Sequence, residues 1–371
     1  MMDILITDRR LEPVKEKVLA GARLDADDGL LLFTSNDLAG IGGLAHYART
    51  KRHGNRAFFV HNRHVNYTNV CVNRCLFCAY SRDAADKGAY TFSMEQVREI
   101  AMAPENRRVK EFHVVGGLNP ALPFDYYIDL LRTIKEARPD ATIKAFTAVE
   151  IDFISKAAGL SISETLARLK DAGLEMVPGG GAEVMSDRVR QKLFPRKIPA
   201  DRWLEVVEAV HAAGLTSNGT MLYGHIETLE ERVNHFLKIR DLQDRTGGFS
   251  AFIPLAFHSE NSRLPNIPPT VAFDDLKMIA VARLMLDNVD HIKAYWVMIG
   301  EKLAQVALWF GADDLDGTII EERITHTAGA RSAKGLTRTE MRRFIESAGF
   351  EAVERDSFYR PVNGSDQEGG R

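Results

Sequence analysis

The stretch Cys71-Val-Asn-Arg-Cys75-Leu-Phe-Cys78 holds all three cysteines of this 371-residue chain. Structural thiols usually lie scattered through a core, where they serve as small apolar groups. Three thiols in one short loop, spaced by three residues and then by two, can instead point at a single centre. A disulfide would use two of them and leave the third unpaired, so we do not expect a disulfide framework. The stretch therefore predicts a metal centre.

Two kinds of metal centre fit three cysteines. A structural zinc ion normally takes four protein ligands, so it would need a fourth from His61, His64 or His113. A cubane iron–sulfur cluster is held by cysteine thiolates, and three cysteines for four irons would leave one iron open to another ligand. An open iron indicates chemistry rather than a structural role. The residues alone leave both centres possible.

The spacing Cys-x3-Cys-x2-Cys, with the aromatic Phe77 before the last cysteine, resembles the signature of the radical S-adenosylmethionine superfamily. This resemblance implies a [4Fe-4S] cluster whose open iron binds S-adenosyl-L-methionine through its amino and carboxylate groups. It also implies reductive cleavage of that molecule to methionine and a 5′-deoxyadenosyl radical. An electron donor such as flavodoxin or ferredoxin is then an expected partner, and Phe77 is an expected cofactor-site residue.

Composition limits the other classes of function. The net charge is −3, from 48 basic and 51 acidic residues, which argues against a nucleic-acid partner bound by a basic surface. No apolar run reaches the roughly 18 residues that span a bilayer, so we expect no membrane partner. Residues 1–8 lack a basic region followed by an apolar one, so we expect no signal peptide. We therefore expect a cytoplasmic protein.

Strand-like and helix-like segments alternate along most of the chain. The expected strands are residues 57–60 continuing at 65–67, then 112–115, 141–146, 174–177, 215–222, 248–254 and 291–297. This alternation predicts an α/β fold with a parallel sheet, either closed as a barrel or doubly wound. The superfamily resemblance implies the partial (β/α)6 TIM-like barrel.

The pattern divides the chain into three parts. We expect an N-terminal helical cap over residues 1–56, because apolar residues there recur at helical spacing. Residues 57–312 are expected to form the barrel, and residues 313–371 a C-terminal extension that packs on it. The tail from about residue 363 is polar and rich in glycine, which predicts disorder.

Functional residues of parallel α/β folds lie at the carboxyl ends of the strands. Gly116 and Gly117 follow one expected strand, and by resemblance a glycine-rich motif here contacts the amino group of the methionine moiety. Glu150 follows the next strand, and Glu183 stands after the glycines at 179–181. Both carboxylates are candidates to accept hydrogen bonds from ribose hydroxyls.

The strand expected at residues 215–222 is too polar for an ordinary core, which makes Ser217 and Asn218 candidate substrate-binding residues. Tyr295, in the last expected strand, is a third. Histidines and a tyrosine also stand where strands end. The candidates for catalytic proton transfer are His225, Tyr223 and His258.

Several segments narrow the resemblance to the menaquinone (futalosine pathway) and deazaflavin branch of the superfamily. They are residues 66–69, 179–183, 221–228 and 242–249. Within this branch, residues 217–222 and 253–258 are most similar to the aminofutalosine synthases. Members of that group often have alanine where this chain has Gly219.

The resemblance implies a transferase of menaquinone biosynthesis that adds the adenosyl radical to 3-[(1-carboxyvinyl)oxy]benzoate with loss of carbon dioxide. Related alternatives are a dehypoxanthine futalosine cyclase and a deazaflavin (FO) synthase component, and the non-enzyme alternative is a zinc-stabilised α/β binding protein. The two carboxylates of the aromatic substrate need partners. The candidate arginines are Arg82, Arg196, Arg283 and Arg331.

Overall fold

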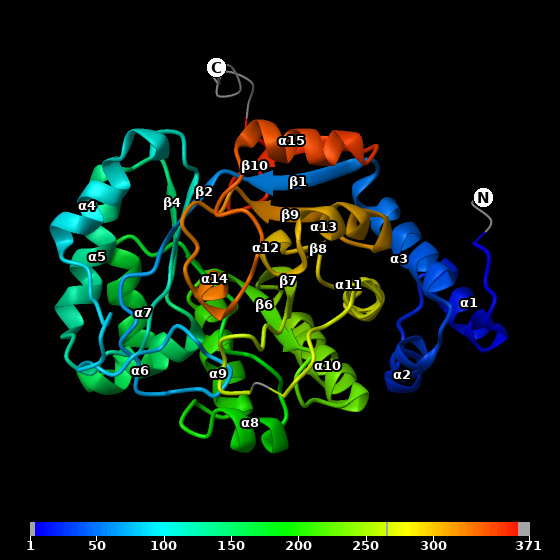
Figure 1. Ribbon diagram of the computed structural model, residues 1–371, viewed down its shortest axis with the longest axis horizontal. Coiled ribbons are helices and arrows are strands. Elements are labelled where there is room, and N and C mark those ends of the chain that lie inside the picture. Colours follow the sequence, from blue (N-terminus) through cyan, green and yellow to red (C-terminus); the bar gives the residue numbers. More distant parts are fainter. Residues whose placement is uncertain (1–3, 265, 363–371) are drawn as a thin grey trace.

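The computed structural model describes residues 4–264 and 266–362. Its centre is a parallel sheet of seven strands in the order β2-β3-β4-β5-β6-β7-β8, curled like part of a barrel (Figure 1). The strands are β2 (Asn62–Val65), β3 (Glu111–Val114), β4 (Thr142–Ala145), β5 (Met176–Val177), β6 (Thr216–Tyr223), β7 (Phe249–Ala256) and β8 (His291–Ile292). The predicted α/β class and TIM-like architecture are confirmed, with seven strands in place of the six of the implied partial barrel.

Helices follow the strands and cover the outer side of the sheet (Figure 1). They are α4 (Met94–Met102), α5 (Phe124–Ala137), α6 (Ala148–Ala158), α7 (Ile162–Asp171), α8 (Asp187–Leu193), α9 (Ala200–Ala212), α10 (Leu229–Thr246) and α11 (Ala272–Met285). Local sequence explains where several begin, because Ser93, Ser161 and Thr228 each form a capping box with the residue three positions on. Gly247 ends α10 in the left-handed conformation, with φ 63°.

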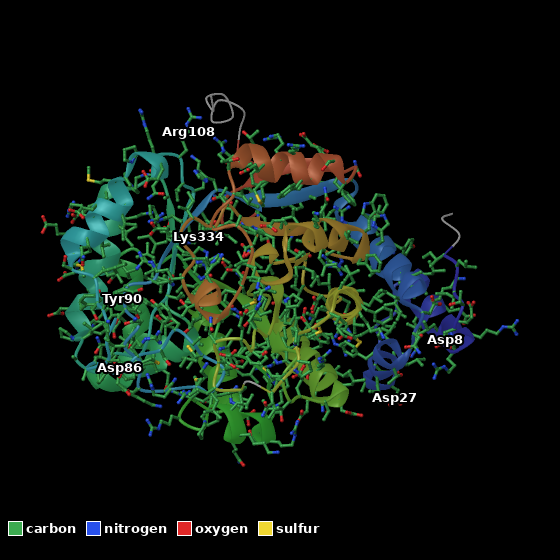
Figure 2. The ribbon with its side chains drawn as sticks, viewed as in Figure 1. Asp8, Asp27, Asp86, Tyr90, Arg108 and Lys334 are labelled. Carbon is green, nitrogen blue, oxygen red and sulfur yellow. The ribbon has the colours of Figure 1, made fainter. Side chains whose placement is uncertain are left out.

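Three helices precede the sheet: α1 (Glu12–Ala20), α2 (Ala26–Thr34) and α3 (Leu38–His53), after the short 3-10 turn η1 (Arg9–Leu11). Leu11 and Val14 are fully buried, as their spacing predicted. Helix α3 packs against α11, and α2 packs against α10. Figure 2 shows this end of the molecule, with Asp8 and Asp27, far from the side that carries Asp86 and Tyr90.

A second parallel sheet, in the order β10-β1-β9, was not predicted. It joins β1 (Arg56–Val60) to β9 (Asp314–Gly317) and β10 (Glu351–Arg355). The expected barrel strand at residues 57–60 therefore pairs with C-terminal strands. Residues 313–320 also form bridges to both edges of the main sheet, Lys293 with Asp314 and Arg63 with Ile320, so this segment closes the gap in the curled sheet.

The remaining short elements lie mainly in the C-terminal part. They are η2 (Pro104–Asn106), α12 (Trp296–Ile299), α13 (Glu301–Ala307), η3 (Leu308–Phe310), α14 (Ile324–Ala328) and α15 (Arg338–Ser347). Of these elements, α14 and α15 lie in the part expected to be the C-terminal extension. The division of the chain at residues 56 and 312 stays a prediction, and the tail predicted to be disordered lies outside the described residues. Across the described ranges, no helix is both long and apolar enough to cross a membrane.

Candidate active site

A cavity of about 320 Å³ lies inside the curled sheet, where the strands give way to their following loops. Its lining is mostly apolar, but eleven of the fourteen residues singled out from the sequence contribute to it. They are Cys71, Cys75, Phe77, Cys78, Gly116, Gly117, Glu150, Glu183, Asn218, His258 and Tyr295. The structure therefore brings together residues from seven separate segments of the chain at one site.

The cysteine loop is held in place by neighbouring backbone. The Cys71 amide donates to the Arg82 carbonyl at 3.0 Å, and the Leu76 amide donates to the Leu193 carbonyl at 2.8 Å. The Arg263 guanidinium donates to the Cys75 carbonyl at 2.9 Å. Arg74, between the first two cysteines, has φ 47°, a conformation that non-glycine residues adopt rarely. These contacts fix the loop as a ligand-bearing turn.

The three sulfurs are spaced more widely than the ligand atoms of a closed zinc site. Across residues 4–264 and 266–362, the one trio of histidine, cysteine or carboxylate ligand atoms within 4.8 Å of one another does not include the cysteines. A tetrahedral zinc ion with Zn–S bonds of about 2.3 Å needs sulfurs about 3.8 Å apart. Because at least one pair of the cysteine sulfurs is wider apart than 4.8 Å, the arrangement is compatible with thiolates that bind separate irons. Burial raises the pKa of the Cys75 thiol to about 12, so a metal must displace its proton.

The glycines at the end of β3 pack directly against the cysteine loop. A Cβ on Gly117 would lie 2.2 Å from the Val70 carbonyl oxygen and 2.9 Å from the Cys71 Cβ. Glu150 accepts hydrogen bonds from the Gly116 amide at 3.0 Å and from the Tyr67 hydroxyl at 2.9 Å. Burial raises the pKa of Glu150. Its carboxylate thus orients the glycine turn, whereas the sequence predicted a direct contact with a ribose.

A buried ion pair stands on the opposite wall, after β5. Glu183 has φ 50° and pairs with Lys197, whose Nζ lies 2.5 Å from Oε1. Although burial acts against the charged form, the charges of Cys75 and Glu183 raise the pKa of Lys197 above its usual range. Sequence reasoning missed Lys197, because it follows a short helix rather than a strand. The strained Glu183 backbone is typical of functional sites.

Strand β6 shows why three predicted site residues lie elsewhere. Side chains alternate between the two faces of a strand, so Asn218 points into the cavity while Ser217 and Tyr223 point outward. The Ser217 hydroxyl bonds His211 Nε2 at 2.8 Å, and the Tyr223 hydroxyl donates to Asp275 at 2.6 Å.

His225 follows the same strand and also lies outside the cavity lining. Its Nδ1 is 2.8 Å from a Glu227 carboxylate oxygen. Ser217, Tyr223 and His225, which the sequence predicted to meet the substrate, are thus the three candidates that this cavity does not bring together with the others. Of the candidate proton carriers, His258 lines the cavity, with its Nε2 2.9 Å from the Met298 carbonyl oxygen.

The comparisons with known proteins agree with this site. The sequence model of the radical SAM superfamily matches residues 65–239, and the model of the CofH/MqnC C-terminal region matches residues 246–367. An aminodeoxyfutalosine synthase from Thermus thermophilus is 46% identical over 96% of this chain and 97% of its own. The one from Streptomyces coelicolor is 42% identical over 93% and 92%. This chain belongs to the radical S-adenosylmethionine superfamily.

The chain is also similar to relatives with other names and to solved structures. A 5-amino-6-(D-ribitylamino)uracil–L-tyrosine 4-hydroxyphenyl transferase from Methanopyrus kandleri is 39% identical over 92% of this chain and 93% of its own. Among solved structures, methylornithine synthase (PylB) has a TM-score of 0.73 at 18% identity, covering 96% of this chain and 99% of its own. The hydrogenase maturase HydG has 0.74 at 18%, covering 96% and 78%. These structures support the fold. The recognition made from the cysteine motif is confirmed, and the protein is a radical S-adenosylmethionine enzyme rather than a zinc-stabilised binding protein.

The cavity residues fit the ligands that this superfamily uses, S-adenosylmethionine and an iron–sulfur cluster. Three cysteines face one space and can each supply a thiolate. Gly179 lets backbone approach closely, since a Cβ there would lie 2.4 Å from the Asn218 carbonyl oxygen. The buried Oδ1 of Asn218 has no hydrogen-bond partner within the protein, so it is available to a donor on a ligand.

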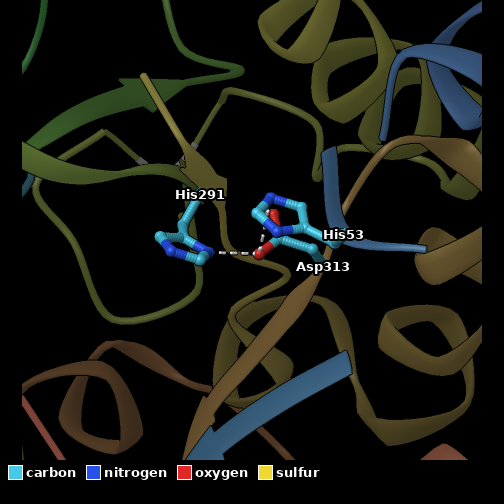
Figure 3. Close-up of side chains that lie close together, drawn as sticks. All are labelled: His53, His291 and Asp313. Atoms are coloured by element: carbon cyan, nitrogen blue, oxygen red, sulfur yellow. Dashed lines mark hydrogen bonds and ion pairs between the residues drawn. The ribbon is translucent and has the colours of Figure 1, made fainter. Parts of the chain in front are cut away.

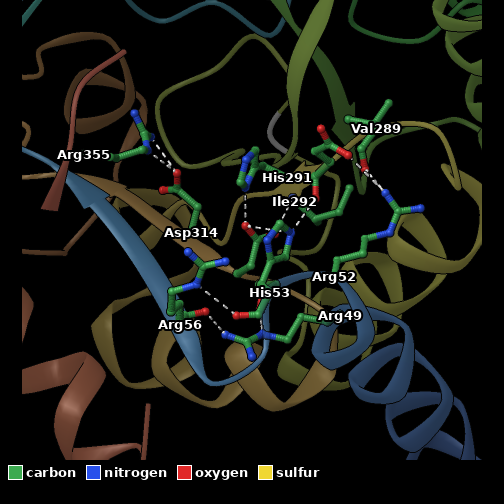
Figure 4. A network of polar contacts seen from close by, with 12 residues as sticks. Arg49, Arg52, His53, Arg56, Val289, His291, Ile292, Asp314 and Arg355 are labelled. Carbon is green, nitrogen blue, oxygen red and sulfur yellow. Dashed lines mark hydrogen bonds and ion pairs between the residues drawn. The ribbon is translucent and has the colours of Figure 1, made fainter. Parts of the chain in front are cut away.

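A second cluster of ionisable residues lies at the opposite, amino end of the sheet. His53, His291 and Asp313 are all buried, and His291 Nδ1 lies 2.5 Å from Asp313 Oδ2 (Figure 3). His53 Nε2 bonds the Asp290 carbonyl at 2.8 Å, and Arg283 donates to the other oxygen of Asp313. Figure 4 shows further arginines around this network. Because both carboxylate oxygens of Asp313 and one ring nitrogen of each histidine already have protein partners, we assign the cluster to stability rather than to metal binding.

Proposed function

We propose that this enzyme is an aminodeoxyfutalosine synthase. The observation that carries the proposal is the identity of 46% and 42% to two proteins of that name, along almost the whole chain. In the proposed reaction, C5′ of the adenosyl group of S-adenosylmethionine bonds to the vinyl carbon of 3-[(1-carboxyvinyl)oxy]benzoate. Methionine and carbon dioxide leave, and the adenosyl group remains in the product, so S-adenosylmethionine is consumed as a substrate.

The proposed cofactor is a [4Fe-4S] cluster held by Cys71, Cys75 and Cys78. When bound, it supplies the electron that cleaves S-adenosylmethionine, and a small electron-transfer protein such as flavodoxin or ferredoxin would reduce it. Phe77 and Gly117 border the same space, and Glu183 on the facing wall is placed to accept hydrogen bonds from ribose hydroxyls. The direct role of each of these residues is part of the proposal.

The cavity also suits a reaction that passes through a reactive radical. Its walls carry the apolar side chains of Ile253, Leu255 and Phe257, which exclude water from the space beside the cysteines. His258 lies on this wall and is the remaining sequence-predicted candidate for moving a proton during product formation.

A second candidate is the 4-hydroxyphenyl transfer named for the archaeal relatives, because five of these relatives are 36–37% identical and another is 39% identical. The match to the CofH/MqnC C-terminal region does not separate the two functions. That reaction would use L-tyrosine and a ribitylaminouracil, so the two candidates differ in whether adenosine becomes part of the product.

Product analysis tests the proposal. The protein would be reconstituted anaerobically with iron and sulfide, then mixed with reductant, S-adenosylmethionine and 3-[(1-carboxyvinyl)oxy]benzoate, and adenine-containing products followed by mass spectrometry. We expect an adenosyl–benzoate adduct that has lost carbon dioxide. Release of 5′-deoxyadenosine without an adduct would overturn the proposed substrate. A parallel reaction with L-tyrosine and 5-amino-6-(D-ribitylamino)uracil would then test the second candidate, and dehypoxanthine futalosine the cyclase alternative.

A further inference from the structure

The deep end of the cavity is polar, although a barrel interior is normally filled by apolar side chains. Lys144 on β4 pairs with Glu111 on β3 at 2.6 Å, and Lys293 after β8 pairs with Asp316 on β9 at 2.8 Å. All four side chains are buried. Burying two ion pairs contributes little to stability, because desolvation offsets most of their attraction. Asp316 lines this floor of the cavity and the other three side chains lie behind it, and such buried polarity beside a cavity indicates recognition of a polar part of a ligand.

Two histidines lie at this end of the cavity lining. His64 on β2 and His113 on β3 are register partners, and their rings stack in parallel with centroids 4.5 Å apart. His64 is 7% exposed, and its Nε2 has no hydrogen-bond partner in the protein. Burial lowers the pKa of both side chains, so both rings are neutral in the free protein, and each carries one N–H donor. A buried ring nitrogen without a partner is costly unless a ligand meets it.

We propose that His64 and His113 bind the ring carboxylate of the aromatic substrate, an inference that rests on the function proposed above. Other cationic or imidazole donors of the lining already have partners: Lys197 pairs with Glu183, and His258 bonds the Met298 carbonyl.

The four candidate arginines named from the sequence lie outside the cavity lining. Arg283 is buried against Asp313 at the amino end of the sheet, and Arg331 is exposed beside Glu260. Arg82 and Arg196 are absent from the lining as well, and their guanidinium groups donate to the backbone carbonyls of Ala79 and Val72. Lys144 and Lys293 lie behind the lining, where their charges offset those of Glu111 and of Asp316, the one member of the two pairs that lines the cavity.

The depth of His64 and His113 in the cavity decides which of the two substrate carboxylates reaches them. His113 lies in β3, three residues before Gly116 in the loop that follows the strand, which places it up to roughly 10 Å deeper at about 3.3 Å per residue. The vinyl carbon must meet C5′ of the adenosyl group beside the cysteine and glycine loops. The ring carboxylate is the opposite end of the substrate, so it is the group that reaches the floor.

The test pairs changes in the protein with a change in the ligand. His64→Phe keeps a stacked ring and removes both nitrogens, whereas His64→Gln keeps a donor near the Nε2 position. Dissociation constants would be measured by calorimetry, with S-adenosylmethionine bound and no reductant, for 3-[(1-carboxyvinyl)oxy]benzoate and for its analogue without the ring carboxylate. We expect His64→Phe to weaken binding of the full substrate about 10- to 100-fold, with partial recovery in His64→Gln.

Binding of the analogue shows whether the histidines contact the ring carboxylate itself. Wild type should bind the analogue more weakly than the full substrate, and His64→Phe should lose most of this preference, because the variant and the analogue remove the two sides of the same contact. If His64→Phe is unstable, His113→Phe can replace it and should give the same change in binding. His235→Phe, a buried histidine outside the cavity lining, is the matched control and should keep the full preference. Equal preferences for the carboxylate in wild type and both phenylalanine variants would overturn the inference, while failure of wild type to bind the full substrate would overturn the proposed function itself.

Discussion

Lys197 and Glu183 form an ion pair in the cavity wall with 2.5 Å between Nζ and Oε1, and both side chains are about nine-tenths buried. The lysine also acts on Cys75, whose pKa would be higher still without this positive charge. The Lys197 ammonium lies 5.2 Å from the centre of the Phe77 ring. The Lys197 ammonium thus links the cysteine loop to the glycine turn that follows β5.

Breaking this pair from one side should destabilise the protein. Lys197→Met leaves Glu183 buried without a partner, so we expect the free energy of unfolding to fall by about 3 kcal/mol. Adding Glu183→Gln removes the uncompensated charge and should restore part of the loss. Urea unfolding of the metal-free variants, followed by tryptophan fluorescence, measures both changes. If the double variant is as unstable as the single one, the charge of Glu183 is not what destabilises the protein.

Each cysteine should be needed for the metal. In Cys71→Ala, Cys75→Ala and Cys78→Ala, the cluster loses one of its three protein ligands, so retained iron should fall from about four per chain to well below one. Iron, sulfide and zinc analysis of anaerobically reconstituted protein measures this directly. One zinc per chain in the wild type, with little iron or sulfide, would contradict the cluster assignment.

Gly117 should be needed for the position of the ligand loop. In Gly117→Ala the new Cβ meets the Val70 carbonyl at 2.2 Å, which forces the loop to move and should lower iron incorporation several-fold. Gly335→Ala is the matched control, because its Cβ meets atoms no closer than 3.6 Å. Iron content after identical reconstitution distinguishes the two, and equal content would show that the close approach is not critical.

The sequence was informative wherever chemistry is local. Three cysteines in one loop and glycines directly after strands identify themselves by type and spacing, and Ser93 marks a helix start through its capping box. The sequence could not show which face of a strand borders the cavity. Ser217 and Asn218 are adjacent and equally polar, yet they point to opposite sides of β6, and the polarity of the strand does not reveal which side is the cavity.

Pairing between residues of distant segments was the second feature that the sequence could not predict. Strand β9, with the sequence Asp-Leu-Asp-Gly, lacks the apolar alternation of a half-buried strand, because Asp314 and Asp316 are matched by Arg355 and Lys293 from distant segments. Lys197 likewise becomes a site residue only through a partner 14 positions away. Buried charges of this kind are visible in the fold and not in hydrophobic periodicity.

Buried neutral histidines should make the protein sensitive to acid. Burial lowers the pKa of His61 and His211 to about 4 and that of His235 to about 3. In the unfolded chain each titrates near 6.5. Since the unfolded state then binds more protons, their contribution is present above pH 6.5 and is lost as the pH falls toward 4. His326 behaves in the opposite way, because Glu322 raises its pKa to about 9, so its contribution is present below 6.5 and is lost as the pH rises through 9.

The variant His211→Gln isolates one of these groups. Its imidazole bonds Thr246 and Ser217 at 2.7 and 2.8 Å, and a glutamine amide can keep one such bond without titrating. We expect the variant to be less stable than wild type at pH 7.5 but to lose less stability on acidification, by up to about 3 kcal/mol between pH 6.5 and 4. Urea unfolding at a series of pH values measures both slopes. Parallel curves for the two proteins would mean that His211 has the same pKa folded and unfolded, and that the acid sensitivity arises at other residues.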